Sequence, residues 1–459
     1  MSRKKRRRNA RERDARPGRF PAPSRDVGGG IAAAALLLAI ACAGLVVDSG
    51  ADNLFDPPKR LTTLACAAAA ALAAFGVSRW RNPLSGLSRR RFSSASGAAA
   101  CLLLAAGLAV LAAFVSPRRA AAVDATRTLL VYSLLLALGA SRVVEKRKHL
   151  LLTVFLAVVA VDAVVSFLQA TNIYQPRPLL TIGTREATGA FVGNPGSLAM
   201  ALVLSAVACL AVLLFGQPGA LRAAAAAGVA GFAGGLLVNR NLTSLSALVA
   251  GAGILLMARR GRRAILPIAL ILLCVGVVVA SYPPMRSRAR EALSALRSRD
   301  WDRFVSYRLG AWTAALEMVR DRPWIGFGPG TYGAEFIPHR LRAEIGARRR
   351  MGNPLATSSY GEAHNDYLHP FAEAGIPAGL LVLAAAALLL RGLVLAARRT
   401  ADARRGEVVF LLAFLGAGAV AALTWFPFQR PITAIPLLLA AGRAWKLSAD
   451  SDAGAAAKA

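Results

Sequence analysis

Acidic side chains are scarce in this sequence of 459 residues. It has 24 Asp and Glu against 56 Lys and Arg, which gives a formal net charge of +32 at pH 7. Such an excess occurs in nucleic-acid-binding proteins. It also occurs in membrane proteins, which concentrate Lys and Arg in short cytoplasmic loops. The long apolar runs described below favour the second explanation, so we expect no nucleic-acid partner.

Motifs for metal binding are lacking as well. The five cysteines all lie within apolar runs and lack the spacing of metal ligands. There is no His-Glu-x-x-His sequence. One external Asp-x-Asp, formed by Asp300 and Asp302, is flanked by Arg299 and Arg303, which favours ion pairing over metal binding. We therefore predict that the protein uses no metal ion and no cofactor.

Polar stretches are few, because 56% of the residues are hydrophobic and the mean hydropathy is +0.49. Apolar runs of roughly 17–25 residues recur, and each can cross the hydrocarbon core of a bilayer. The runs are continuous rather than alternating, which excludes a transmembrane barrel. The sequence predicts an all-α polytopic membrane protein with about twelve transmembrane helices, at 27–47, 61–77, 97–115, 128–141, 149–170, 197–215, 223–238, 242–257, 264–281, 371–395, 408–425 and 431–445.

Basic loops orient these spans, because short cytoplasmic loops are enriched in Lys and Arg. The first span follows a basic tail, a pattern that signal peptides share, and we interpret it as uncleaved. Loop 116–127 is an exception, since it is expected outside and yet is basic. The predicted organisation is a cytoplasmic tail 1–26, spans one to nine in 27–281, an external helical loop 282–370, spans ten to twelve in 371–445 and a cytoplasmic tail 446–459.

Within this plan two regions carry further predictions. Asp162 lies well inside the fifth expected span, where an acid is costly unless paired or hydrated. It would form an interhelical hydrogen bond or line a cavity, and we favour the hydrogen bond. In the long loop the patterns predict helices at 285–299 and 303–320, followed by a glycine-rich turn at 326–330.

A cluster of titratable side chains stands where the long loop enters the tenth expected span. Glu362, His364, Asp366, His369 and Glu373 fall within twelve positions. His364 is suited to act as a general base near neutral pH, or to hydrogen-bond a leaving phosphate. Glu373 would either stabilise the N-terminal end of the following helix or orient His364, and the sequence assigns His369 no role.

Three arginines of the expected external loops, Arg185, Arg240 and Arg308, are candidates for binding phosphate. A guanidinium can bind a phosphate through two parallel hydrogen bonds. The alternative for each is a solvated charge at the lipid headgroups. Arg240 is confined near the membrane surface, because its turn between two spans is very short.

Three blocks of sequence together resemble the O-antigen ligase and O-antigen polymerase family of bacterial inner-membrane glycosyltransferases. The first resembles the family's Gly-Asn-Pro block, the second its Arg-x-x-x-Trp and Asp-x-Pro-x-x-Gly-x-Gly block, and the third its His-Asn-x-x-Leu and Glu-x-Gly block. They stand in the family's order, in external loops. They are Thr188–Pro195 with Leu198 and Ala199; Arg308–Trp312 with Asp321–Gly330; and Ala363–Leu368 with Glu373–Gly375.

The resemblance implies a GT-C-like helical fold in the bacterial inner membrane, with both termini cytoplasmic. It implies a glycan donor on undecaprenyl pyrophosphate, an acceptor that is lipid A-core or a growing glycan, and metal-independent transfer at the periplasmic face. By this resemblance His364 is catalytic, and Arg185, Arg240 and Arg308 bind pyrophosphate. The supporting residues would be Asn194, Trp312, Asn365, Asp366 and Glu373.

One departure from the family pattern concerns the eighth span, where Ser244-Leu245-Ser246 replaces a frequent Ser-Arg-Gly. Arg240, about one turn earlier, is expected to supply that charge. O-antigen ligase activity on lipid A-core is the leading prediction. A polysaccharide polymerase is the alternative, followed by protein O-glycosylation. Outside this class, a transporter or lipid flippase is disfavoured, because the polar groups lie at the outer mouth and not at the midplane.

Overall fold

The structure is a computed structural model that describes residues 27–47, 56–76, 93–173, 188–348, 360–400 and 402–456. Throughout these ranges the secondary structure is helical and contains no β-strand. Nine helical segments among them are long and apolar enough to cross a membrane, when the continuous segment Leu242–Ser281 is counted once. The predicted all-α polytopic membrane fold is confirmed.

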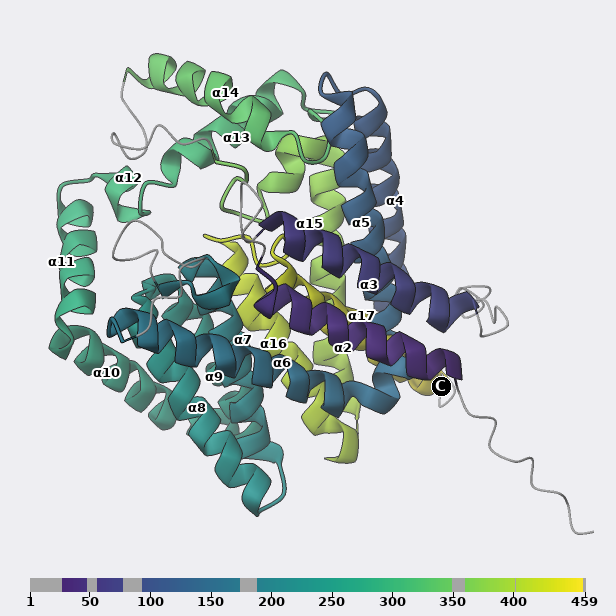
Figure 1. Cartoon of the computed structure of the whole chain (residues 1–459), viewed down its shortest axis with the longest axis vertical. Coiled ribbons are helices and arrows are strands. Elements are labelled where there is room, and N and C mark those ends of the chain that lie inside the picture. Colours follow the sequence, from purple (N-terminus) through teal and green to yellow (C-terminus); the bar gives the residue numbers. More distant parts are fainter. Residues whose placement is uncertain are drawn as a thin grey trace, which may run out of the picture.

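Twelve long helices correspond to the twelve expected spans, and Figure 1 shows how they are bundled. The segment Leu242–Ser281 supplies two of them, joined by the 3₁₀ turn η5 (Gly261–Ala264). The helices are α2 (Val27–Leu45), α3 (Asp56–Gly76), α4 (Ser94–Phe114), α5 (Arg119–Gly139), α6 (Arg142–Ala170), α7 (Pro195–Phe215), α8 (Ala220–Asn239), α9 (Leu242–Arg260), α10 (Ile265–Ser281), α15 (His369–Arg399), α16 (Asp402–Ala422) and α17 (Pro431–Ala456).

Several helices begin before their apolar runs. Their first turns are formed by the basic residues that precede the apolar stretch. The segment 116–127, expected to be a loop, is mostly the first turns of α5, which begins at Arg119. The basic loop expected at 142–148 is the start of α6, where the Ser141 hydroxyl caps the helix by accepting from the Val144 amide.

Helix α7 lies at the centre of the bundle. Its side chains are apolar all round and almost all of them are buried, which is typical of a helix enclosed by others. It packs against α8, α9 and α16. The N-terminus of α7 therefore lies at the centre of one end of the bundle, among the loops that join the outer helices.

The long segment between α10 and α15 forms four further helices, α11 (Pro283–Arg297), α12 (Trp301–Phe304), α13 (Leu309–Asp321) and α14 (Tyr332–Ala347). The prediction of one helix over 303–320 is wrong. Ser306 and Tyr307 both have positive φ, at 56° and 61°, which interrupts a right-handed helix. This break separates α12 from α13 and leaves Arg308 at the start of α13.

The turn between α13 and α14 contacts the residues that join α4 to α5, and Figure 1 shows both in the upper part of the view. The Ser116 hydroxyl donates to the Phe327 carbonyl oxygen, and the Arg118 guanidinium pairs with Glu335 at 3.1 Å. The basic residues at the start of α5 therefore lie on the same side of the bundle as α13 and α14, beside the only long polar segment of the chain.

Polar side chains inside the bundle hold the first sequence block in place. Along one face of α6, the Asp162 carboxylate accepts from the Phe191 amide at 3.0 Å, and Gln169 accepts from the Ala190 amide at 2.9 Å. From α3 the Lys59 ammonium donates to the Phe191 carbonyl oxygen. Asp162 therefore bonds to the backbone of the turn η4 (Ala190–Val192), which leads directly into α7.

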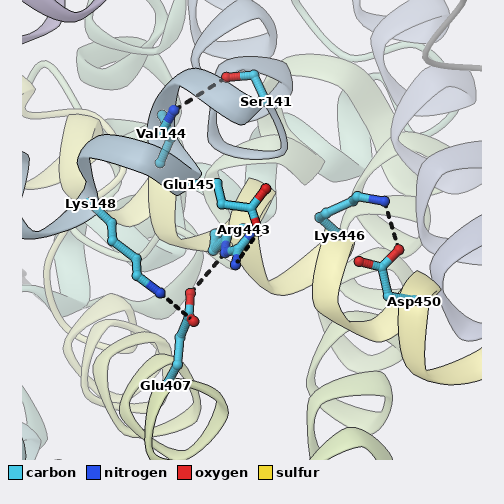
Figure 2. A network of polar contacts seen from close by, with 8 residues as sticks. All are labelled: Ser141, Val144, Glu145, Lys148, Glu407, Arg443, Lys446 and Asp450. Atoms are coloured by element: carbon cyan, nitrogen blue, oxygen red, sulfur yellow. Dashed lines mark hydrogen bonds and ion pairs between the residues drawn. The ribbon is translucent and has the colours of Figure 1, made fainter. Parts of the chain in front are cut away.

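At the opposite end of the bundle a buried ionic network joins three helices (Figure 2). The Arg443 guanidinium of α17 donates to Glu407 of α16 at 2.8 Å and to Glu145 of α6 at 3.2 Å. Lys148 of α6 also pairs with Glu407. Only 7% of the Arg443 side chain is exposed, so this network fixes the relative positions of α6, α16 and α17.

Candidate active site

The loop that carries His364 is bound firmly to the turn between α16 and α17. The Asn365 side chain donates to the Leu423 carbonyl oxygen at 2.9 Å. The Asp366 carboxylate accepts from the Phe428 amide and from the Gln429 side chain, both at 2.9 Å. Burial raises the pKa of Asp366 to about 6, although the two hydrogen bonds act in the opposite direction and lower the pKa. Asn365 and Asp366 therefore join two loops and do not contact an open site.

His364 is enclosed by aromatic rings on three sides. Its ring meets those of Tyr360, Phe426 and Trp425 edge to face, at centroid distances of 4.7, 4.8 and 5.3 Å. The residue adopts a left-handed backbone conformation with φ at 52°, which is uncommon outside glycine and occurs often at functional sites. The loop thus orients the imidazole between the rings.

The hydrogen bonds and surroundings of His364 define its protonation state. Nδ1 lies 3.1 Å from the Glu362 carbonyl oxygen, which can only accept, so Nδ1 carries the hydrogen and Nε2 keeps its lone pair. Burial lowers the pKa of His364 to about 4, and the cations Arg308 and Arg430 contribute to the lowering. The imidazole is therefore neutral at pH 7, with Nε2 able to accept a proton.

Arg308 contacts the same tryptophan. Its guanidinium carbon is 5.7 Å from the Trp425 ring centroid, a cation–π distance. One nitrogen donates to the Val305 carbonyl oxygen at 3.3 Å, while Nε is buried without a hydrogen bond from any described residue. Burial lowers the pKa of Arg308. Such a buried, incompletely bonded cation is suited to an anionic ligand.

The N-terminus of α7 completes this arrangement. The Asn194 side chain caps the helix by accepting from the Gly196 and Ser197 amides at 2.9 and 3.1 Å. The Trp425 ring packs so closely on Gly196 that a Cβ there would lie 2.3 Å from it. Gly196, which directly follows the first sequence block, therefore meets Arg308 of the second block and His364 of the third at Trp425.

Arg240 lies on the same side of the bundle. Contacts of Gly228 with Cys209 and of Gly235 with Leu202 define the register of the antiparallel α7 and α8. In this register Arg240 is level with Ser197, next to the Gly196 that touches Trp425. Its Nε is buried without a hydrogen bond from the described part of the chain. The structure gives it no contact with His364, and Arg185 lies outside the described residues.

Glu373 stabilises a helix terminus, although not that of its own helix. Its carboxylate accepts from the amide of Tyr332, the first residue of α14, at 3.1 Å. Its second oxygen is 3.2 Å from Nε2 of His369, and Nδ1 of His369 accepts from the Ala363 amide. Glu373 is thus occupied by α14 and His369, and His369 links α15 to the loop that precedes His364.

Two glycines interlock the second and third sequence blocks. Gly326 and Gly375 have φ of 71° and 83°, and a Cβ on either would lie 2.5 Å from backbone atoms of the other block. The Gly328 amide donates to the Glu373 carbonyl oxygen at 2.8 Å, and the Ile376 amide donates to the Pro323 carbonyl oxygen at 2.7 Å. This close backbone contact explains the glycine spacing in both blocks.

Comparison with known proteins identifies the second and third blocks. Residues 225–383 match the family model described as O-antigen ligase. This part of the chain is similar to the O-antigen ligase family. The resemblance inferred from the sequence blocks is therefore confirmed. No curated protein matches the chain.

The O-antigen ligase match includes Arg240, Arg308 and His364, but it ends before the turn that surrounds His364. Two residues of that turn, Trp425 and Arg430, were not among the candidates from the sequence. The Arg430 guanidinium lies 4.7 Å from the Phe426 ring centroid and 3.2 Å from Glu362. The signal was the turn between spans eleven and twelve, expected to be external, where three aromatic residues are followed by a single arginine.

Trp312 follows Arg308 by one turn of α13 and packs on a core of the long polar segment. Its indole nitrogen is buried without a hydrogen-bond partner in the described ranges, as is that of Trp425. No group of three His, Cys, Asp or Glu side chains able to hold a metal ion occurs among the residues that the structure describes. Beside the acceptor Nε2 of His364, the unpaired groups of the described residues at Trp425 include two donors, Nε of Arg308 and the indole nitrogen of Trp425, which suits an anion.

Proposed function

We propose that this protein transfers a glycan from undecaprenyl pyrophosphate to an acceptor hydroxyl at the periplasmic face of the bacterial inner membrane. The observation that carries the proposal is the meeting of Gly196, Arg308 and His364 at Trp425. The Arg308 cation and the neutral His364 base thereby both contact the Trp425 ring, at the N-terminus of the central helix α7. This is the set of groups that the transfer requires.

The pyrophosphate is assigned to the arginines. Arg308 and Arg240 each have a buried Nε without a hydrogen bond from the described residues, and a phosphate oxygen would satisfy such donors. The N-terminus of α7 adds its positive dipole end between them. As the pyrophosphate leaves, its negative charge is stabilised in a partly dehydrated site, which can supply much of the rate enhancement. Arg185 is proposed to join them.

His364 is proposed to act on the acceptor. The acceptor oxygen attacks the anomeric carbon, and the bond from that carbon to the pyrophosphate oxygen breaks with its electron pair on the phosphate. The hydroxyl proton passes to Nε2 of His364, the nitrogen that keeps its lone pair. A single displacement of this kind inverts the anomeric configuration and involves no metal ion.

Binding of the donor would make His364 a stronger base. Arg308 is one of the cations that lower the pKa of His364. A pyrophosphate on Arg308 compensates that charge, so the pKa of His364 should rise when the donor is bound. The supporting residues hold this geometry: Asn194 caps α7, Trp312 packs behind Arg308, Asn365 and Asp366 fix the loop, and Glu373 fixes α14.

The test is transfer by the purified protein from a polyprenyl pyrophosphate-linked glycan, with and without chelator. The His364→Ala variant should lose transfer and still insert and purify as the wild type does. His149→Ala is the matched control, because His149 is exposed at the far end of α6 and its loss should leave the rate unchanged. Normal glycosylation by His364→Ala would refute the assignment.

The acceptor separates the two activities that share this donor. Lipid A-core and a second copy of the donor should be offered in parallel. We expect transfer to lipid A-core, which identifies a ligase. Extension of the lipid-linked glycan instead would identify the alternative, a polymerase, because both activities use the same pyrophosphate and base.

A further inference from the structure

A groove lies at the end of the bundle opposite to His364. It is enclosed by α9, α15 and α16 and has a volume of about 770 Å³, within the range of about 300–1,000 Å³ that small-molecule sites occupy. Its walls are apolar over roughly 10 Å of helix length. The apolar residues that line the groove include Ala250, Gly253, Ile254, Ala397, Val409 and Leu412.

The groove is open because its floor is made of small residues. A Cβ placed on Gly253 would meet no atom within 4 Å, so the space in front of α9 is unfilled. An apolar space of this kind in a membrane protein is filled by hydrocarbon. Its length along the helices fits part of an acyl chain that runs parallel to α9 and α16.

Two arginines mark one end of the groove. Arg398 and Arg405 both line it, and both are exposed. Neither forms an ion pair or hydrogen bond with a side chain that the structure describes, a set that leaves out residues 401–403. Their neighbour Arg399, by contrast, pairs with Asp452 at 3.4 Å.

Helix dipoles account for only one of these two charges. Arg398 stands in the last turn of α15, where a cation is favoured. Arg405 stands in the first turn of α16, which begins at Asp402, and a cation is disfavoured there. An external anion at the mouth of the groove would offset this cost, and both guanidinium groups could reach it.

We propose that the groove binds an acidic phospholipid, with the phosphate at Arg398 and Arg405 and an acyl chain along Gly253 and Ile254. The same end of the bundle carries the short basic loops, so the lipid belongs to the leaflet expected to be cytoplasmic. The proposal is independent of the transferase activity. The groove is also remote from His364, since α15 begins at His369 and Arg398 is in its last turn.

The experiment is native mass spectrometry of the full chain after exchange into phosphatidylglycerol or phosphatidylcholine. The wild type should retain one phosphatidylglycerol in preference to phosphatidylcholine. The double variant Arg398→Gln/Arg405→Gln should bind it about 30-fold more weakly, as expected for the loss of two cations near a lipid headgroup. Arg260→Gln/Arg262→Gln is the matched control, because both residues are exposed, Arg260 at the end of α9 and Arg262 in the turn η5.

A second variant tests the apolar part. Gly253→Leu keeps both arginines and enters open space, so it should fold normally and still displace the retained lipid. Equal retention of the two phospholipids by the wild type would overturn the proposal. So would an equal loss in the control double variant, which would indicate diffuse attraction, or full retention by Gly253→Leu.

Discussion

The protonation of His364 provides the sharpest test of the site. With a pKa of about 4, the imidazole differs from an ordinary histidine by about 2.5 pKa units, which corresponds to roughly 3 kcal/mol. At pH 7 about one molecule in 10³ carries a proton on His364. We therefore expect kcat/KM for the donor to stay constant well below pH 6.5, because that parameter reports the free enzyme.

The same assay distinguishes the role of the arginine. In kcat, which reports the enzyme with its donor bound, the acid limb should lie at higher pH, because the pyrophosphate compensates Arg308. The Arg308→Gln variant should raise the pKa of His364 only partly, since burial is the largest cause of the lowering. Coincident limbs in kcat and kcat/KM would contradict a pyrophosphate on Arg308.

The titration can also be observed directly. The chain has four histidines, so a sample labelled only at histidine gives few NMR signals, and His364→Asn identifies the one of interest. A titration near pH 6.5 would refute the enclosed imidazole. The lowered folded-state pKa also means that the unfolded chain binds the extra proton, so stability should fall by roughly 3 kcal/mol as the pH drops from 6.5 to 4.

Three further substitutions test how the site is held. Gly375→Ala should cost about 1–3 kcal/mol of stability through its φ alone and reduce transfer, whereas Gly276→Ala in open space should not; equal thermal midpoints would contradict this. Arg443→Met should destabilise by about 1–3 kcal/mol, because Glu145 and Glu407 lose the guanidinium and Glu407 keeps only Lys148, while the exposed Arg399→Met should change the midpoint little. Arg430→Gln should lower kcat on the order of 10²-fold, the loss expected when catalytic groups are displaced. The variant extracted in detergent should elute from size exclusion as the wild type does.

The helices were predictable because the bilayer imposes its thickness on apolar runs. All twelve expected spans have a corresponding helix, although the sequence missed the extra turns at α5 and α6, where basic residues continue a helix beyond the apolar core. The break at Ser306 and Tyr307 was missed because neither residue is Gly, Asn or Asp, the residues that most readily adopt a positive φ.

The candidate site was predictable only in part. His364 and Arg308 stand in recognisable blocks, and the structure brings them together. Trp425 and Arg430 were missed because they lie far along the chain from either block, and only the tertiary fold brings them beside His364. Asp366 was predicted only as a supporting residue, and the sequence did not indicate its partners, the Phe428 amide and the Gln429 side chain.

The position of Trp425 has a consequence for biosynthesis. Chains fold progressively from the N-terminus as they are made, and Trp425 follows Arg308 by 117 residues and His364 by 61. Arg308 and His364 are therefore synthesised before the ring that both contact. The proposed site is complete only once the turn after α16 is in place, so a chain truncated before Trp425 would carry Arg308 and His364 without a completed site.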